Sequence, residues 1–113
     1  MLIAAIDRIA PADPLLFDVA RAELAFDQRT GEPLVSFRFT PESARRFAEF
    51  TQRNVGHVAE MRVDGKVLSR PVIREPITGG NGQISGHLSA QEAQDLAARL
   101  TGGTKLEIEA LAN

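Results

Sequence analysis

The amino-acid sequence predicts an α+β domain in which two helices pack on one face of a mainly antiparallel sheet. Two segments, 40–54 and 89–103, carry apolar residues at helical spacing, whereas several shorter segments alternate apolar and polar residues as half-buried strands do. Asp64 and Gly65 separate two of these alternating segments and form a preferred pair for a two-residue hairpin turn. With 113 residues, the chain has the length of a single domain that can bury a core without metals or disulfides.

Residues 1–21 are expected to form a lead-in, and residues 22–113 the domain itself. The lead-in contains Pro11 and Pro14 and no sustained periodicity, so at most a short strand or helical turn is expected there. The segments ARAELAF and LVSFRF alternate on either side of the turn-rich DQRTGEP, which predicts an antiparallel hairpin. The residues expected on the apolar sides of its strands are Ala22, Leu24 and Phe26, followed by Val35, Phe37 and Phe39.

A helix is predicted after this hairpin, over residues 40–54. Thr40 is a favoured N-cap residue, and Pro41 suits the first helical position, where no intrahelical N–H is needed. The apolar stripe of this helix comprises Ala44, Phe47, Ala48 and Phe50.

A second hairpin is predicted from HVAEMRV and KVLSRPVI, joined by Asp64 and Gly65 in a type I′ turn, which needs positive φ at both positions. Pro71 lacks an N–H, so its strand is expected to lie at a sheet edge or to bend there.

The second helix is marked at its start by Ser89 and Glu92, which have the spacing of a capping box, and at its end by Gly102 or Gly103. TKLEIEALAN then alternates as a closing half-buried strand. Four to six strands and two helices in this order predict a ferredoxin-like or porter-like sandwich.

Composition excludes several functional classes. The net charge is −2 and the pI is about 5.7, so no basic surface for nucleic acid is expected. The absence of cysteine excludes thiol catalysis, zinc–thiolate sites and disulfides. No segment is long and apolar enough to span a membrane, and no signal peptide is visible, because LIAAI is short and is followed by Asp7 and Arg8.

The glycine-rich stretch EPITGGNGQISG, residues 75–86, does not match a phosphate-binding loop. No Lys-Ser or Lys-Thr pair follows its glycines, their spacing is out of step with a dinucleotide fingerprint, and the residues after Gly82 resemble a strand rather than a helix start. We therefore interpret Gly79, Gly80, Gly82 and Gly86 as a structural loop that reverses the chain between strands.

No pattern of catalytic or metal-binding residues is present. His57 and His87 lack the spacing of a metal site, and Ser85, two residues before His87, is not in a nucleophile elbow. We therefore expect a protein without enzymatic activity, metal or cofactor. A deep pocket holding a carboxylate or histidine with a strongly shifted pKa would indicate an enzyme instead.

Three longer motifs carry a family resemblance. The segments FTPESARRFAEFTQRNVG, VDGKVLSRPVIREPITGGNGQISG and LSAQEAQDLAARLTGG, in this order and spacing, resemble the head subdomain of the first large periplasmic domain of SecD. SecD is the membrane subunit that assists the Sec translocon. The resemblance covers about residues 22–103 and implies the same fold, an extracytoplasmic location and contact with an unfolded or translocating polypeptide.

The sequence also departs from the SecD pattern. Arg70 stands where the family usually has a small residue and His87 where asparagine is common, while TKLEIEALAN replaces a proline-rich return. The membrane spans and base subdomain of SecD have no counterpart in this sequence, so it corresponds to a stand-alone relative or an excised domain.

An apolar run interrupted by prolines is the predicted binding surface for a polypeptide. It comprises Pro71, Val72, Ile73 and Ile77. Burial of Val72 and Ile73 in the core is the alternative interpretation. A structural role, with self-association into a homo-oligomer through the same apolar edge, is the alternative function.

Overall fold

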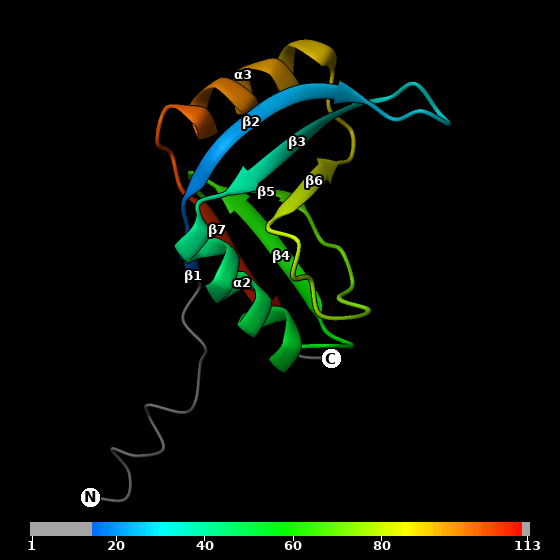
Figure 1. Cartoon of the computed structure of the whole chain (residues 1–113). Helices are drawn as coiled ribbons and strands as arrows, with labels where there is room; N and C mark the ends of the chain where they lie inside the picture. The colour runs from blue at the N-terminus through cyan, green and yellow to red at the C-terminus, as the bar shows by residue number, and fades with distance from the viewer. Residues whose placement is uncertain (1–14, 112–113) are drawn as a thin grey trace, which may run out of the picture.

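The computed structural model describes residues 15–111, which form seven strands and two helices (Figure 1). Of the predicted lead-in, residues 1–14 lie outside the described residues. In chain order the elements are β1 (Leu15–Phe17), β2 (Val19–Phe26), β3 (Pro33–Phe39), α2 (Pro41–Arg53), β4 (Val58–Val63), β5 (Lys66–Ser69), β6 (Asn81–Ser85), α3 (Ala90–Thr101) and β7 (Leu106–Leu111).

The α+β class and the antiparallel pairing are confirmed, but the strands form two sheets rather than one. One sheet has the order β1-β7-β4-β5 and the other β2-β3-β6. The first crossing from the four-stranded to the three-stranded sheet is at Asp18, the single residue between β1 and β2. Alternation within a strand reports which side chains are buried but not which strands are neighbours, so the sequence pattern did not reveal this division.

The two helices pack in different places and not on one face of a common sheet. Helix α3 packs on β2 and β3 of the three-stranded sheet, whereas α2 lies beside the four-stranded sheet (Figure 1). Phe47 and Phe50 of α2 contact Phe17 of β1, with ring centroids 5.5 and 6.2 Å apart. Phe39 of β3 lies 5.5 Å from the same ring, so a cluster of phenylalanines joins the two sheets.

The fold begins before the boundary predicted at residue 21. Leu15–Phe17 pairs with β7, and Phe17 is fully buried in the core. A strand of three residues is too short to display a period of two, which is why the sequence pattern indicated only a lead-in.

Both helices begin where the capping residues predict. The Thr40 side chain accepts a hydrogen bond from the Ser43 backbone N–H at 3.3 Å. Ser89 and Glu92 form a complete capping box, and Gly103, with φ of 115°, follows the end of α3. These ends are determined locally, so the sequence was sufficient to predict them.

The hairpin of β4 and β5 also has the predicted turn. Asp64 and Gly65 have φ values of 53° and 82° and lie between the paired residues Val63 and Lys66. Strand β5 is at the edge of its sheet and its regular pairing ends at Ser69, two residues before Pro71, as expected.

Candidate functional site

The glycine-rich stretch, residues 75–86, contains the approach to β6 and the whole of this strand. Gly80 has φ of 77°, and its carbonyl accepts a hydrogen bond from Phe39 N–H at 2.9 Å. Gly82 pairs with Phe37 across the sheet, and a Cβ at this position would lie 2.9 Å from the Phe37 ring. Gly79 and Gly86 are exposed at either side of the strand. Gly80 makes the turn into β6, whereas Gly82 lies within the strand rather than in a loop and leaves room there for the Phe37 ring.

The four residues predicted to bind a polypeptide are not all at the surface. Ile73 is buried, with 3% of its surface exposed, whereas Val72 is 46% and Ile77 37% exposed. Val72 bridges to Val58, so it lies beside β4, on the side where β5 pairs further along the strand. The alternative interpretation, in which both Val72 and Ile73 are buried in the core, is therefore correct for Ile73 and wrong for Val72.

The segment that carries these residues is tied to the fold by its backbone. The Pro71 carbonyl accepts from Ala59 N–H at 2.8 Å, and Ile73 exchanges hydrogen bonds with Gly56 and His57. Ile77 N–H donates to the buried Thr51 hydroxyl at 2.9 Å. Helical periodicity did not predict the role of Thr51, because a polar residue was not expected on the buried side of α2.

Of the four outer sheet edges formed by the described residues, three are blocked against pairing with another strand. At β1, Arg46 donates to the Leu16 carbonyl at 3.0 Å. At β2, the Thr101 hydroxyl bonds both the N–H and the carbonyl of Ala22 at 3.1 Å. Strand β5 carries Lys66, an irregular register and a nearby proline. Charges, bulges and proline are the usual means by which proteins protect sheet edges.

In the part of the chain that the structure describes, the outer edge of β6 carries none of these protections. The Phe39 N–H donates to the Gly80 carbonyl, and in an antiparallel pair every second residue is hydrogen-bonded to the neighbouring strand. The residues at the alternate positions, Asn81, Gln83 and Ser85, therefore direct their backbone N–H and C=O groups away from β3. Within residues 15–111, β3 is the only strand that pairs with β6. Strand β6 contains no charged residue and no proline, and these three residues are exposed.

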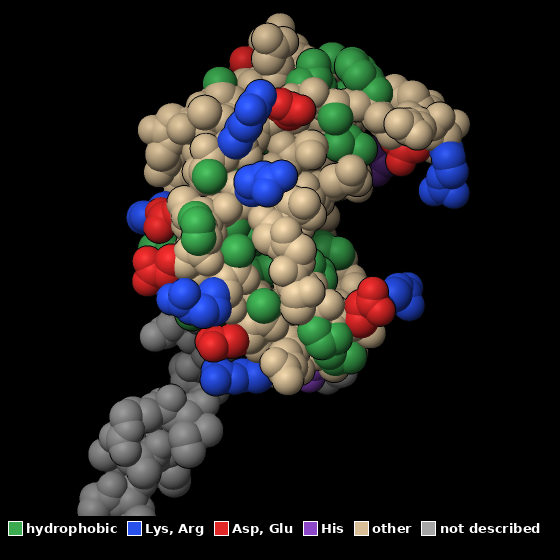
Figure 2. Space-filling view, viewed as in Figure 1, with side chains coloured by type: hydrophobic (Ala, Val, Ile, Leu, Met, Phe, Trp, Pro, Cys, Tyr) green, Lys and Arg blue, Asp and Glu red, His purple; other side chains and the backbone are tan. Residues whose placement is uncertain are grey.

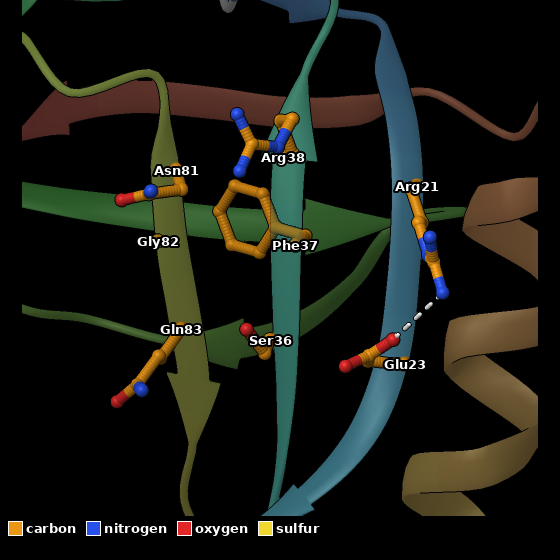
Figure 3. Close-up of a pocket in the computed structure, with 8 residues that line it drawn as sticks. All are labelled: Arg21, Glu23, Ser36, Phe37, Arg38, Asn81, Gly82 and Gln83. Atoms are coloured by element: carbon orange, nitrogen blue, oxygen red, sulfur yellow. Dashed lines mark ion pairs between the residues drawn. The ribbon is translucent and has the colours of Figure 1, made fainter.

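A shallow polar groove of about 590 Å³ lies beside this edge, on the open face of the three-stranded sheet (Figure 3). Arg21 and Glu23 pair with each other over β2 at 3.4 Å. The Arg38 side chain extends from β3 towards β6 (Figure 3). The groove is lined by Arg21, Glu23, Ser36, Phe37, Arg38, Asn81, Gly82 and Gln83.

The molecule is also hollowed on one side, as Figure 2 shows. The hollow lies between the projecting tip of the β2–β3 hairpin and the segment that leads into β6 (Figures 1 and 2). Phe26, near this tip, is exposed, although alternation placed it on the apolar side of its strand. Asn81, Gln83 and Ser85 of β6 are exposed, and the end of the strand approaches β5, where the Leu68 carbonyl lies 3.5 Å from the Cβ position of Gly86.

A network of charges lies on the outer face of the four-stranded sheet. Arg62 bonds Glu107 and Glu109 of β7 at 3.0 and 2.9 Å and also pairs with Glu60. Arg70 donates to Glu60 at 2.8 Å. The carboxylates raise the pKa of Arg62, and the hydrogen bond from Arg70, followed by that from Arg62, lowers the pKa of Glu60. The sequence indicated a half-buried strand here but not the pairing, which depends on β4 and β7 being neighbours.

This network predicts an acid dependence of stability. Because the pKa of Glu60 is lower in the folded domain than its ordinary value of 4.5, its contribution is present above that value and is lost as the pH falls through the folded pKa. Between about pH 5 and about pH 3, Glu60→Gln should therefore lose less stability than the original domain. Urea unfolding at each pH measures this loss. Glu49→Gln, on the exposed side of α2, is the control, and equal pH dependence in the original domain and Glu60→Gln would contradict the expectation.

The residues considered for catalysis are not brought together. His57 lies against the end of β7, where its Nδ1 is 3.2 Å from the Leu111 carbonyl. His87 is exposed between β6 and α3. Among residues 15–111, no group of three or more histidine, aspartate or glutamate residues is arranged to hold a metal ion. No helix in this described range has the length and apolar character needed to cross a membrane.

Comparison with known proteins identifies relatives of this fold. The family model "SecDF, P1 head subdomain" matches residues 17–106. The protein translocase subunit SecD of Thermobaculum terrenum is 46% identical over 87 residues, which are 77% of this chain and 17% of that protein. The chain therefore spans about a sixth of the length of this curated relative.

Solved structures of SecDF share the fold. One, of SecDF in a super-membrane-facing form, matches with a TM-score of 0.73 and 41% identity over 84% of this chain and 13% of the other. Another, described as a membrane component that enhances protein export, matches with a TM-score of 0.73 and 40% identity over 85% of this chain and 44% of the other. This chain belongs to the SecDF P1 head subdomain family.

Proposed function

We propose that this domain contacts an extended polypeptide during protein export, without catalysing a reaction, and that the contact is made along the outer edge of β6. The observation that carries the proposal is that, among the outer strands within residues 15–111, β6 alone lacks these protections against pairing. Its relatives are named as protein translocase subunits and as a component that enhances protein export. By the same relationship, we place the domain on the extracytoplasmic side of the membrane.

Pairing at a sheet edge suits an export component because it depends on the backbone of the bound chain. An added strand would bond the outward N–H and carbonyl groups of Asn81, Gln83 and Ser85. Every polypeptide carries the same backbone groups, so many sequences would be accepted. Each such bond contributes only about 1 kcal/mol, which favours transient contact and release. Ile77, which is exposed four positions before β6, would add apolar contact.

Nuclear magnetic resonance titration with a synthetic peptide tests the proposal. The probe is a capped nine-residue peptide of alternating valine and threonine. We expect chemical-shift changes at Asn81, Gln83 and Ser85, with slower solvent exchange of their amides. A peptide N-methylated at alternate positions should bind when the methyl groups face outward and not when they face β6. Shifts centred on Pro71 and Val72, or no shifts at all, would contradict this placement.

A protein variant provides an independent test. Gln83→Pro removes an outward N–H that makes no bond to β3, so it should abolish peptide binding while an amide spectrum shows that the fold is kept. Gln83→Thr retains the N–H and is the control that should bind as the original domain does. Equal binding by the proline variant would contradict pairing at β6.

Self-association is a second candidate function because the same unprotected edge can pair with that of another copy. Sedimentation equilibrium over a range of concentrations distinguishes the two. A dimer that Gln83→Pro dissociates would support self-association, whereas a monomer at all concentrations would exclude it.

A further inference from the structure

We infer that the polypeptide bound along β6 carries an acidic side chain, which Arg38 recognises from the neighbouring strand. This inference rests on the proposed function and specifies the class of polypeptide that the edge prefers. Its basis is the polar groove beside β6, which backbone pairing alone does not use.

An added strand would place one row of its side chains on the open face of the three-stranded sheet. Successive strands are roughly 4.8 Å apart, so an added residue opposite Asn81 would lie two spacings from Arg38. Arg38 already extends towards β6, and Asn81 lies between it and the outer edge (Figure 3). An arginine and a glutamate side chain together reach across this interval, and the Asn81 amide offers a further donor to a carboxylate.

The charges of the groove favour an acidic group over a basic or apolar one. Arg21 is paired with Glu23, whereas Arg38 has no carboxylate within 4.0 Å among residues 15–111. The three ionised groups in the groove therefore leave one unmatched positive charge at Arg38. A lysine at the same place in the bound chain would be repelled, and a carboxylate would form charge-assisted hydrogen bonds with the guanidinium.

The opposite row of the bound strand would meet a different surface. Gly82 and Ile84 direct this side of β6 towards the core, and the Leu68 carbonyl lies 3.5 Å from the Cβ position of Gly86 at the end of the strand. Partly buried Leu68 packs on the core there. The preferred segment would thus alternate acidic or polar residues with apolar ones.

Matched peptides test this inference. In the valine–threonine probe, the two central threonines are replaced by glutamate, glutamine or lysine, and dissociation constants are measured at about 0.05 M and about 0.5 M salt. We expect the glutamate peptide to bind about threefold more tightly than the glutamine peptide at low salt, with the lysine peptide the weakest. Because salt screens exposed charges, the preference should fall towards unity at high salt.

The Arg38→Gln variant should remove the preference while leaving binding of the glutamine peptide unchanged. Arg21→Gln, which makes the same change of charge in the same groove, is the control and should keep the preference. Equal binding of glutamate and glutamine peptides by the original domain, or equal losses in both variants, would overturn the inference but not the proposed function. Failure of every peptide to bind would overturn both.

Discussion

Replacing Phe17 by alanine is expected to destabilise the domain by about 3–5 kcal/mol, the usual cost of removing a fully buried phenylalanine. Phe17 is fully buried, contacts the rings of Phe39, Phe47 and Phe50, and lies 5.0 Å below the Arg46 guanidinium. It therefore joins β1 to both α2 and the second sheet. Urea unfolding measures the change in the free energy of unfolding, which for a domain of this size is typically about 5–15 kcal/mol.

The neighbouring residue supplies the control for this substitution. Leu16 is in the same strand but points away from the core and is half exposed, so Leu16→Ala should cost less than about 1 kcal/mol. A Phe17→Ala variant as stable as Leu16→Ala would show that β1 is not part of the folded domain. The pair of variants thus tests directly whether the domain begins before residue 22.

Gly82→Val is expected to destabilise the domain by about 1–3 kcal/mol, the typical cost of overpacking a core. A Cβ at residue 82 would lie 2.9 Å from the Phe37 ring, which is buried and stacks edge to face on Phe39 at 5.0 Å. The ring is enclosed, so the added side chain would displace β6 or disturb the aromatic cluster. Thermal or urea unfolding measures the loss.

Gln83→Val is the matched control, because the next residue of β6 faces the open groove instead of the core. Valine favours strands, so this variant should be as stable as the original domain or slightly more stable. Equal destabilisation at both positions would mean that β6 rejects valine for reasons unrelated to Phe37.

Elements governed by neighbouring residues could be predicted from the sequence. The start of α2 follows from Thr40 and Pro41, that of α3 from Ser89 and Glu92, and the β4–β5 turn from Asp64 and Gly65. Each depends on hydrogen bonds or dihedral preferences that span only a few residues. The family motifs likewise lie in continuous segments, and the family they indicated is confirmed.

The sequence did not indicate β6 as a candidate site. The apolar run from Pro71 to Ile77 indicated a contact surface, but its members are divided between the core, the side of β4 and the end of α2. The role assigned to β6 depends on what blocks the other edges. Thr101 reaches Ala22 across 79 positions and Arg46 reaches Leu16 across 30, contacts that no local pattern reveals.

The sequence by itself therefore determined the helices, the tight turn and the α+β class, because short-range hydrogen bonding and the period of apolar residues depend on adjacent positions. It also carried the SecD relationship, through motifs that lie in continuous segments. The tertiary structure alone decided that the strands form two sheets, that Phe17 belongs to the core and that Arg62 pairs with carboxylates of β7. Pairing between distant strands is set by the packing of the whole chain. The alternation of apolar and polar residues shows which side chains face the core, but it does not show which strand lies next to which.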